Sequence, residues 1–285
     1  MSEALVLCRF LHFTVVLMLF GAWLFRPLLL KGEAPELDRH QARLTCWLSA
    51  VALLSGIAWT LLITASMADS AAAAFDPHTV GLVLGTTFFG QVWRWHLLIN
   101  AVLLILLFTP WRSSLPWRLG LSTLLLATLA PVGHGAMLDG LSGQLLILNQ
   151  IVHLTCVAAW LGGLLLLVLI LRQPTEPVAA VLRRFSGIGY ALVAGLLISG
   201  LINVRVLTGQ WWPTPLFSGF ALILLIKAML VLAMLGLALF NRLRINDCEQ
   251  RMETLRRSVM LEWLLGIGAV AAVSLLGTLP PMITA

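Results

Sequence analysis

Eight apolar stretches of close to membrane-spanning length follow one another along this chain, and they constrain its fold more than any other feature. A helix needs about 20 mainly apolar residues to cross a bilayer. Helical backbone also satisfies its own hydrogen bonds, which the hydrocarbon cannot do. The sequence therefore predicts an all-α, polytopic membrane bundle of about eight helices, at roughly residues 5–30, 44–66, 93–109, 118–137, 146–171, 186–207, 217–240 and 258–280.

The composition excludes an ordinary soluble domain. The chain is 60% hydrophobic and 11% charged, whereas soluble domains carry about 25% charged residues. A formal net charge of +6 would indicate nucleic-acid binding in a soluble protein, but here the basic residues follow the loops between the apolar stretches. We therefore expect the lipid bilayer as a partner, and no nucleic acid.

Lys and Arg residues are concentrated in alternate loops. The first, third, fifth and seventh loops carry 14 of the 18 Lys and Arg residues, and the loops at about 67–92, 138–145 and 208–216 carry none. Positively charged loops stay in the cytoplasm. Both termini are therefore predicted to lie outside, which is the periplasm if the protein sits in the inner membrane of a Gram-negative bacterium.

This orientation gathers the histidines near the outer surface. His40 alone is predicted to be cytoplasmic. The other five lie in outer loops or within two turns of the outer helix ends: His12, His78, His96, His134 and His153. Such clustering favours a joint site over independent structural histidines, and metal binding is a common use of neutral imidazole.

The fifth apolar stretch carries a polar face. Asn149, His153, Cys156 and Trp160 recur at spacings of four, three and four residues, which stacks them along one side of a helix. An imidazole inside a membrane-length helix is costly unless it faces protein, a ligand or water. We therefore expect His153 to be the most sensitive single position, with Asn149 or Gln150 fixing its ring tautomer.

Further nitrogen and sulfur donors share the predicted outer side. Cys8 and His12 are four residues apart in the first stretch, and the turn after the fourth carries His134 and Met137. If the first and fifth helices pack together, these groups converge with His153 into one ligand set. Imidazole with thiolate or thioether suits copper, and the absence of clustered carboxylates argues against magnesium or calcium.

Small residues support that packing. Gly21 lies in the first stretch, and Gly162 and Gly163 lie in the fifth, below the polar face. Small residues let membrane helices approach closely. Close packing would hold the histidine-bearing helices in register, and His96 and Cys156 are additional candidate ligands there.

Other polar residues lie inside the predicted helices. The positive charge of Lys227, near the middle of the seventh helix, argues against cations passing close by. Glu262, one turn inside the eighth helix, is expected to pair with Arg242 or Arg257 at the inner surface. The candidate second-shell or pathway residues are Asn149, Trp160, Asn203 and Lys227.

Seven segments in order along nearly the whole chain resemble one known family. The sequence is similar to the CopD/PcoD copper-resistance membrane proteins, and most similar to their YebZ-like branch. The most specific parts are the Gly-His turn and the His-x6-Trp-x-Gly-Gly helix. The segments are RFLHF (9–13), TTFFGQVW (86–93), PVGHGAML (131–138), HLTCVAAWLGG (153–163), SGLIN (199–203), LLIKAML (224–230) and LEW (261–263).

The resemblance implies a function and a partner. It implies a single CopD-like transmembrane domain over residues 1–285, in the bacterial inner membrane, that moves copper from periplasm to cytoplasm. It implies that His12, His134 and His153 are the functional histidines. It also implies a periplasmic CopC-like copper-binding partner, expected here as a separate chain.

Two other interpretations stay open at this stage. Paired histidines on facing helices also suit a membrane haem b protein for electron transfer. The chain could instead anchor a soluble copper chaperone. No nucleophile triad, phosphate loop or nucleotide site is recognisable in the sequence, so we do not expect an enzyme.

The predicted topology can be tested directly. Reporter fusions after Pro177 and at the C-terminus should report opposite sides of the membrane, because the first follows an inner loop and the second an outer end. Equal signals from both fusions would contradict the predicted orientation.

Overall fold

The computed structural model describes residues 2–133, 138–217, 219–245 and 248–278. These residues form helices joined by short turns and include no strand. Two short 3-10 helices lie at Ala72–Phe75 and Pro110–Ser113. The α-helices are α1 (Ser2–Leu29), α2 (Pro35–Met67), α3 (Pro77–Thr86), α4 (Phe88–Leu106), α5 (Leu115–Leu129), α6 (Gly140–Arg172), α7 (Val178–Thr208), α8 (Gly219–Leu243) and α9 (Met252–Leu276).

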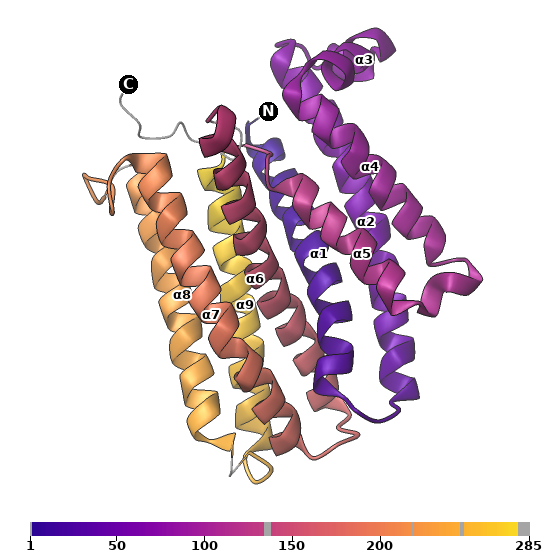
Figure 1. Ribbon diagram of the computed structural model, residues 1–285, viewed down its shortest axis with the longest axis vertical. Coiled ribbons are helices and arrows are strands. Elements are labelled where there is room, and N and C mark those ends of the chain that lie inside the picture. The colour runs from indigo at the N-terminus through magenta and orange to yellow at the C-terminus, as the bar shows by residue number, and fades with distance from the viewer. Residues whose placement is uncertain (1, 134–137, 218, 246–247, 279–285) are drawn as a thin grey trace.

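The predicted all-α, polytopic membrane fold is confirmed. Within the described residues, 7 helices are long and apolar enough to cross a membrane, and α5 is a shorter apolar helix of 15 residues. Each of the eight predicted stretches corresponds to one of these helices. Helix α3 is an addition in the loop at 67–92, where it projects beyond the end of the bundle (Figure 1).

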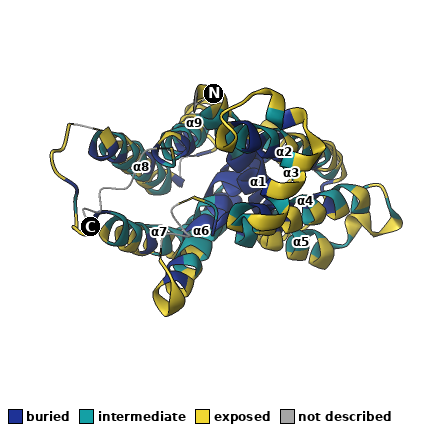
Figure 2. Ribbon diagram, turned by 90° about the horizontal axis from the view of Figure 1, so that it is seen from above, coloured by how far each residue is buried: buried dark blue, intermediate teal, exposed yellow. Residues whose placement is uncertain are grey.

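The helices form two groups joined along α1 and α6. In the first helix group, α2, α4 and α5 lie to one side of α1. In the second helix group, α7, α8 and α9 lie around α6 (Figure 2). Helix α1 packs mainly against α6 and α2, and α9 packs against both α1 and α6. Helix α6 is the most buried span in the bundle. Any site in either group is therefore positioned by the α1–α6 contact.

Glycines permit the close contact between α1 and α6. A Cβ added to Gly21 would lie 2.0 Å from the carbonyl oxygen of Ala158 and 2.7 Å from Cα of Gly162. A Cβ on Gly162 would in turn lie 2.5 Å from Cα of Gly21. The two backbones thus touch without side chains between them, as the small residues of these stretches predict.

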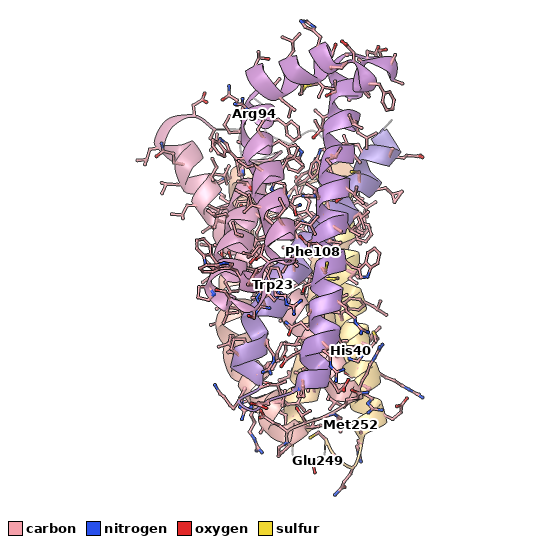
Figure 3. The ribbon with its side chains drawn as sticks, turned by 90° about the vertical axis from the view of Figure 1, so that its right-hand side faces the viewer. Trp23, His40, Arg94, Phe108, Glu249 and Met252 are labelled. Carbon is pink, nitrogen blue, oxygen red and sulfur yellow. The ribbon has the colours of Figure 1, made fainter. Side chains whose placement is uncertain are left out.

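The start of α1 and the end of α9 lie at the same end of the bundle (Figure 1). The guanidinium of Arg9 on α1 donates to the carbonyl of Gly277, just after α9, at 3.0 Å. In Figure 3, Arg94 lies toward this upper end, and His40, Glu249 and Met252 lie toward the opposite end. The loops α1–α2, α6–α7 and α8–α9 also lie at the opposite end (Figure 1).

A carboxylate joins two of the loops at that opposite end. Glu176 accepts from the backbone N–H groups of Lys31 and Gly32 at 2.7 and 3.0 Å, and from the guanidinium of Arg184 at 2.6 Å. These donors lower the pKa of Glu176 to about 2, because they stabilise its ionised form. The α1–α2 and α6–α7 loops are thereby held together.

The glycine contact can be tested by adding one methyl group. Gly21→Ala should destabilise the protein by about 1–3 kcal/mol, because the new Cβ meets the rigid backbone of α6. Thermal unfolding in detergent measures this. Gly236→Ala in α8 is the matched control, since a Cβ there meets nothing within 4 Å and helix propensity alone favours Ala by up to about 1 kcal/mol. Equal melting temperatures for the two variants would contradict the proposed packing.

Candidate metal centre

Two histidines from different helices meet inside the first helix group. Nε2 of His12 on α1 lies 2.9 Å from Nε2 of His96 on α4. Both side chains are fully buried, with 0% of their surface exposed. His12 was predicted as a principal ligand and His96 as an additional one. In the structure these two side chains are in direct contact.

A hydroxyl group holds the other nitrogen of each ring. Nδ1 of His12 lies 3.0 Å from Oγ of Ser55 on α2, and Nδ1 of His96 lies 2.8 Å from Oγ1 of Thr128 on α5. Ser55 donates its own proton to the carbonyl of Val51 at 2.7 Å. Thr128 likewise donates to carbonyls of its own helix, at 2.9 and 3.0 Å. In that arrangement each hydroxyl accepts a hydrogen bond from Nδ1 of its histidine.

The roles of the ring nitrogens depend on the tautomer, and these contacts are compatible with a proton on Nδ1 of both rings. With the proton of each neutral ring on Nδ1, each Nε2 carries a lone pair. The Nε2 lone pairs of His12 and His96 then face each other across 2.9 Å. Two facing lone pairs repel unless a proton or a metal cation lies between them. The arrangement is therefore suited to holding one cation.

Aromatic rings enclose the histidine pair. Trp93 stacks on His96 with ring centroids 4.5 Å apart and an interplanar angle of 10°. Trp59 meets His12 edge-on at 5.6 Å. The indole N–H of Trp93 donates to the carbonyl of Gly56 at 3.0 Å, and this bond fixes the Trp93 ring. The indoles exclude water, and their faces attract cations.

Cys8 lies one helical turn before His12 on α1, toward the N-terminus. Its thiol donates to the carbonyl of Ser55 at 3.2 Å, so Cys8 and His12 contact the same residue of α2. The prediction that these two side chains share one face of the first helix is confirmed. Arg9 lies beside them, with its guanidinium 5.3 Å from the ring centroid of Trp59.

His153 lies in the second helix group, with different neighbours. Its Nδ1 is 2.9 Å from Oγ of Ser199 on α7, and Ser199 donates its own proton to the carbonyl of Gly195. The ring therefore carries its proton on Nδ1. The expectation that Asn149 or Gln150 fixes this tautomer is wrong, because Ser199 lies on the facing helix at the depth of the imidazole.

The predicted second-shell amides instead bond to one another. Asn149 donates to the carbonyl of Ser199 at 3.0 Å and to the amide oxygen of Asn203 at 2.9 Å. Asn203 donates to the amide oxygen of Gln150 at 2.9 Å. Cys156, one turn inward from His153, packs against Gly195, where a Cβ would lie 2.7 Å from the sulfur. These contacts join α6 to α7.

A cavity of about 190 Å³ lies beside His153. Most of its wall is aliphatic. Its cationic residues are Arg9 and Lys227, and no described residue in the wall is an aspartate or glutamate. Like charges at short range in a low dielectric repel strongly, so this cavity is a poor place for a metal cation.

The expected ion pair of Glu262 is wrong. Glu262 is buried and accepts from the indole N–H of Trp160 at 2.9 Å and from the amide of Asn241 at 3.4 Å. Arg257 pairs with Glu253 on its own helix, and Arg242 lies over the ring of Tyr190. The side chain of Glu262 is buried against Trp160 and Asn241, and both arginines have other partners.

The structure thus separates the predicted ligands. His12 contacts α2 and α4, and His153 contacts α7 and lines a different cavity. Within the described residues, no group of three or more His, Cys, Asp or Glu side chains could hold a metal ion. His134 and Met137 lie outside the described residues, so their predicted role stays a prediction.

Sequence reasoning missed the three hydroxyls that orient the rings. Ser55, Thr128 and Ser199 are ordinary small residues inside apolar stretches, and serine and threonine there usually bond to their own helix. A signal was available, because polar side chains across a membrane helix contact often pair with one another. Matching each hydroxyl to its histidine requires the packing of the helices.

Fold and site together define a polytopic helical membrane protein with a buried pair of histidines. Residues 1–144 match the family described as "Copper resistance protein D-like, N-terminal domain", and residues 179–276 match "Copper resistance protein D". The chain belongs to the copper resistance protein D family.

Three relatives extend the match over almost the whole chain. "Inner membrane protein YebZ" of Escherichia coli (strain K12) is 32% identical, over 96% of this chain and 97% of its own length. "Copper resistance protein D" of Pseudomonas syringae pv. tomato is 29% identical, over 96% and 95%. "Copper transport protein CutJ" of Bacillus subtilis (strain 168) is 27% identical, over 95% of this chain and 52% of its own length.

No solved structure matches the chain. The relatives and the apolar helices identify a copper-related, multi-pass protein of the inner membrane. The resemblance seen in the sequence motifs is thereby confirmed at the level of the family.

Proposed function

We propose that the protein binds copper between His12 and His96 and passes it from the periplasmic side of the inner membrane toward the cytoplasm. Family membership supports the choice of copper as the substrate. The observation that carries the choice of site is the pair of Nε2 atoms facing each other at 2.9 Å in a fully buried position.

The chemistry of the pair suits a first-row metal. Imidazole nitrogens bind such ions at about 2 Å, so an ion between them needs the 2.9 Å gap to open toward about 4 Å. Neutral imidazole also suits copper, and a nearby thiol favours its reduced form. Cys8 lies one helical turn before His12, where its sulfur can bind copper before the ion reaches the histidine pair. His134 and Met137 remain proposed ligands on the same side.

The proposed direction rests on charge. If the basic loops face the cytoplasm, both termini are periplasmic and the histidine pair opens toward the periplasm. A separate periplasmic CopC-like protein would then be the donor. We also propose that residues 1–285 act as one domain, because α1 packs along α6 and Arg9 joins the ends of α1 and α9.

A buried amide suggests the next step inward. Asn100 lies one turn beyond His96 on α4 and is 0% exposed. Neither its Nδ2 nor its Oδ1 has a hydrogen-bond partner among the described residues, and the hydroxyl of Ser49 on α2 is likewise unpaired and buried. Unpaired buried polar groups are costly. We propose that the side-chain amide of Asn100 contacts copper as the ion moves inward from the histidine pair.

The haem alternative is less well supported by this geometry. The Nε2 atoms of His12 and His96 are 2.9 Å apart and the rings are tilted by 59°, with Trp93 stacked on His96. A porphyrin between them would need these side chains to separate widely. The anchoring alternative gives no reason for a buried pair of imidazoles with facing lone pairs.

Substitution of either histidine tests the site. His12→Ala and His96→Ala should each reduce bound copper to background, because one nitrogen cannot replace two. Ser55→Ala should weaken copper binding by about 10- to 100-fold, through loss of ring orientation. Metal analysis and a visible spectrum of the purified proteins measure copper and haem together.

The controls for this test lie elsewhere in the bundle. His40→Ala, at an exposed inner position, should change nothing. The His153→Ala protein should bind as much copper as the wild type. We therefore propose His12 and His96, in place of His153, as the most sensitive positions. Copper lost from His153→Ala but retained in His96→Ala would contradict the proposed site, and a Soret band would favour haem.

Replacement of Asn100 by an apolar residue separates stability from function. Asn100→Leu should stabilise the protein by about 1–3 kcal/mol, because it removes unpaired buried polar atoms. The same change should slow copper uptake into proteoliposomes. Asn203→Leu is the matched control and should destabilise the protein, since Asn203 is fully bonded. A destabilised Asn100→Leu protein with normal uptake would contradict the proposed role.

A further inference from the structure

The α4–α5 hairpin ends short of the inner ends of α1 and α2 (Figure 1). In Figure 3, Phe108 at its tip and Trp23 on α1 both lie between Arg94 at the upper end and His40 near the lower end. Below the hairpin, the sides of α1 and α2 border a cavity of about 500 Å³. This cavity is distinct from the histidine pair and from the cavity beside His153.

Three arginines line this cavity. Arg26 comes from α1, Arg112 from the α4–α5 connection and Arg118 from α5. Asp38 is the one carboxylate among the described lining residues, and it is bonded to Arg26 at 2.6 and 2.9 Å. Arg112 and Arg118 are left without a carboxylate of their own in this wall. The cavity therefore carries an excess of two positive charges.

Two donors in the wall have no acceptor. The indole N–H of Trp23 is unpaired, and this side chain is only 1% exposed. Nε of Arg118 is also buried without a partner, and the Arg118 guanidinium lies 5.8 Å from the Trp23 ring. Buried donors without acceptors are costly. Both atoms are covered by surrounding protein, so a ligand with strong acceptor oxygens would satisfy them once the two side chains turn toward the cavity.

The residues around the cavity mark a membrane interface. Trp47, Trp111 and Trp117 on the flanking segments are each more than half exposed, at 72%, 60% and 53%. Tryptophan is enriched at the level of the lipid headgroups. An exposed apolar side chain, Phe108, lies at the tip of the hairpin. If these tryptophans lie at the headgroup level, a phospholipid headgroup can enter the cavity from the side with its acyl chains in the bilayer.

We propose that this cavity binds the phosphate group of an anionic phospholipid. Arginine forks match phosphate oxygens in pairs, and basic pockets between membrane helices on the cytoplasmic side are suited to such headgroups. Arg112 and Arg118 bind the phosphate, Trp23 donates its indole N–H, and Arg26 stays with Asp38. The excess positive charge makes the same cavity unsuitable as an exit for copper ions. This proposal does not depend on the identity of the metal.

The test uses full-length, delipidated protein in detergent. The probes are a phosphatidylglycerol, a phosphatidylcholine with the same acyl chains, and inorganic phosphate. We expect phosphatidylglycerol to raise the melting temperature and to remain bound in native mass spectra. Phosphatidylcholine and millimolar inorganic phosphate should do neither. Displacement of the lipid by inorganic phosphate would assign the site to free phosphate and overturn the lipid proposal.

Variants locate the binding. R112Q/R118Q should bind phosphatidylglycerol roughly 30-fold more weakly, the fold-change that corresponds to two arginines at about 1 kcal/mol each. R172Q is the matched control, because Arg172 is exposed at the same end and outside the cavity. If the double variant does not fold, R112Q alone serves, since Arg112 is exposed on a connecting segment. Equal losses in R112Q and R172Q, or unchanged binding in both, would overturn the proposal.

Discussion

A hydrogen bond from an imidazole to a helix hydroxyl is the interaction on which the site depends. Ser55, Thr128 and Ser199 each donate to a carbonyl of their own helix. Each can therefore accept a hydrogen bond from Nδ1 of the histidine opposite, which leaves the lone pair on Nε2. For His12 and His96 these lone pairs meet at 2.9 Å. Without the hydroxyls, these contacts would no longer favour the Nδ1 tautomer, in which Nε2 is free to bind a metal.

Arg9 borders both histidine sites, over the ring of Trp59 and in the wall of the cavity at His153, so Lys227 is the charge that distinguishes them. His12 and His96 lie among indole rings, whose faces attract cations. His153 lies beside a cavity lined by Arg9 and Lys227, and positive charges in a low dielectric repel a metal ion. The tight glycine contact between α1 and α6 fixes both groups relative to each other. We therefore propose the histidine pair of the first group as the copper site, with the arginine-lined cavity of the same group outside the copper route.

The fold was predictable because it follows from length and apolarity, whereas the exact site was not. The spacing of Cys8 and His12 correctly placed both on one helix face, and the Gly21 and Gly162 contact followed from residue size. The pairing of His12 with His96 instead of His153 depends on how far each helix is rotated about its axis. One residue turns a helix by about 100°, so periodicity alone does not choose between neighbouring partners.

X-ray absorption spectra of copper-loaded protein test the central claim most directly. If His12 and His96 hold the metal, the wild-type spectrum should show imidazole nitrogens at about 2 Å. The H153Q spectrum should be the same, and H96Q should lose the ordered imidazole shell. A nitrogen shell that survives in H96Q but disappears in H153Q would contradict the account.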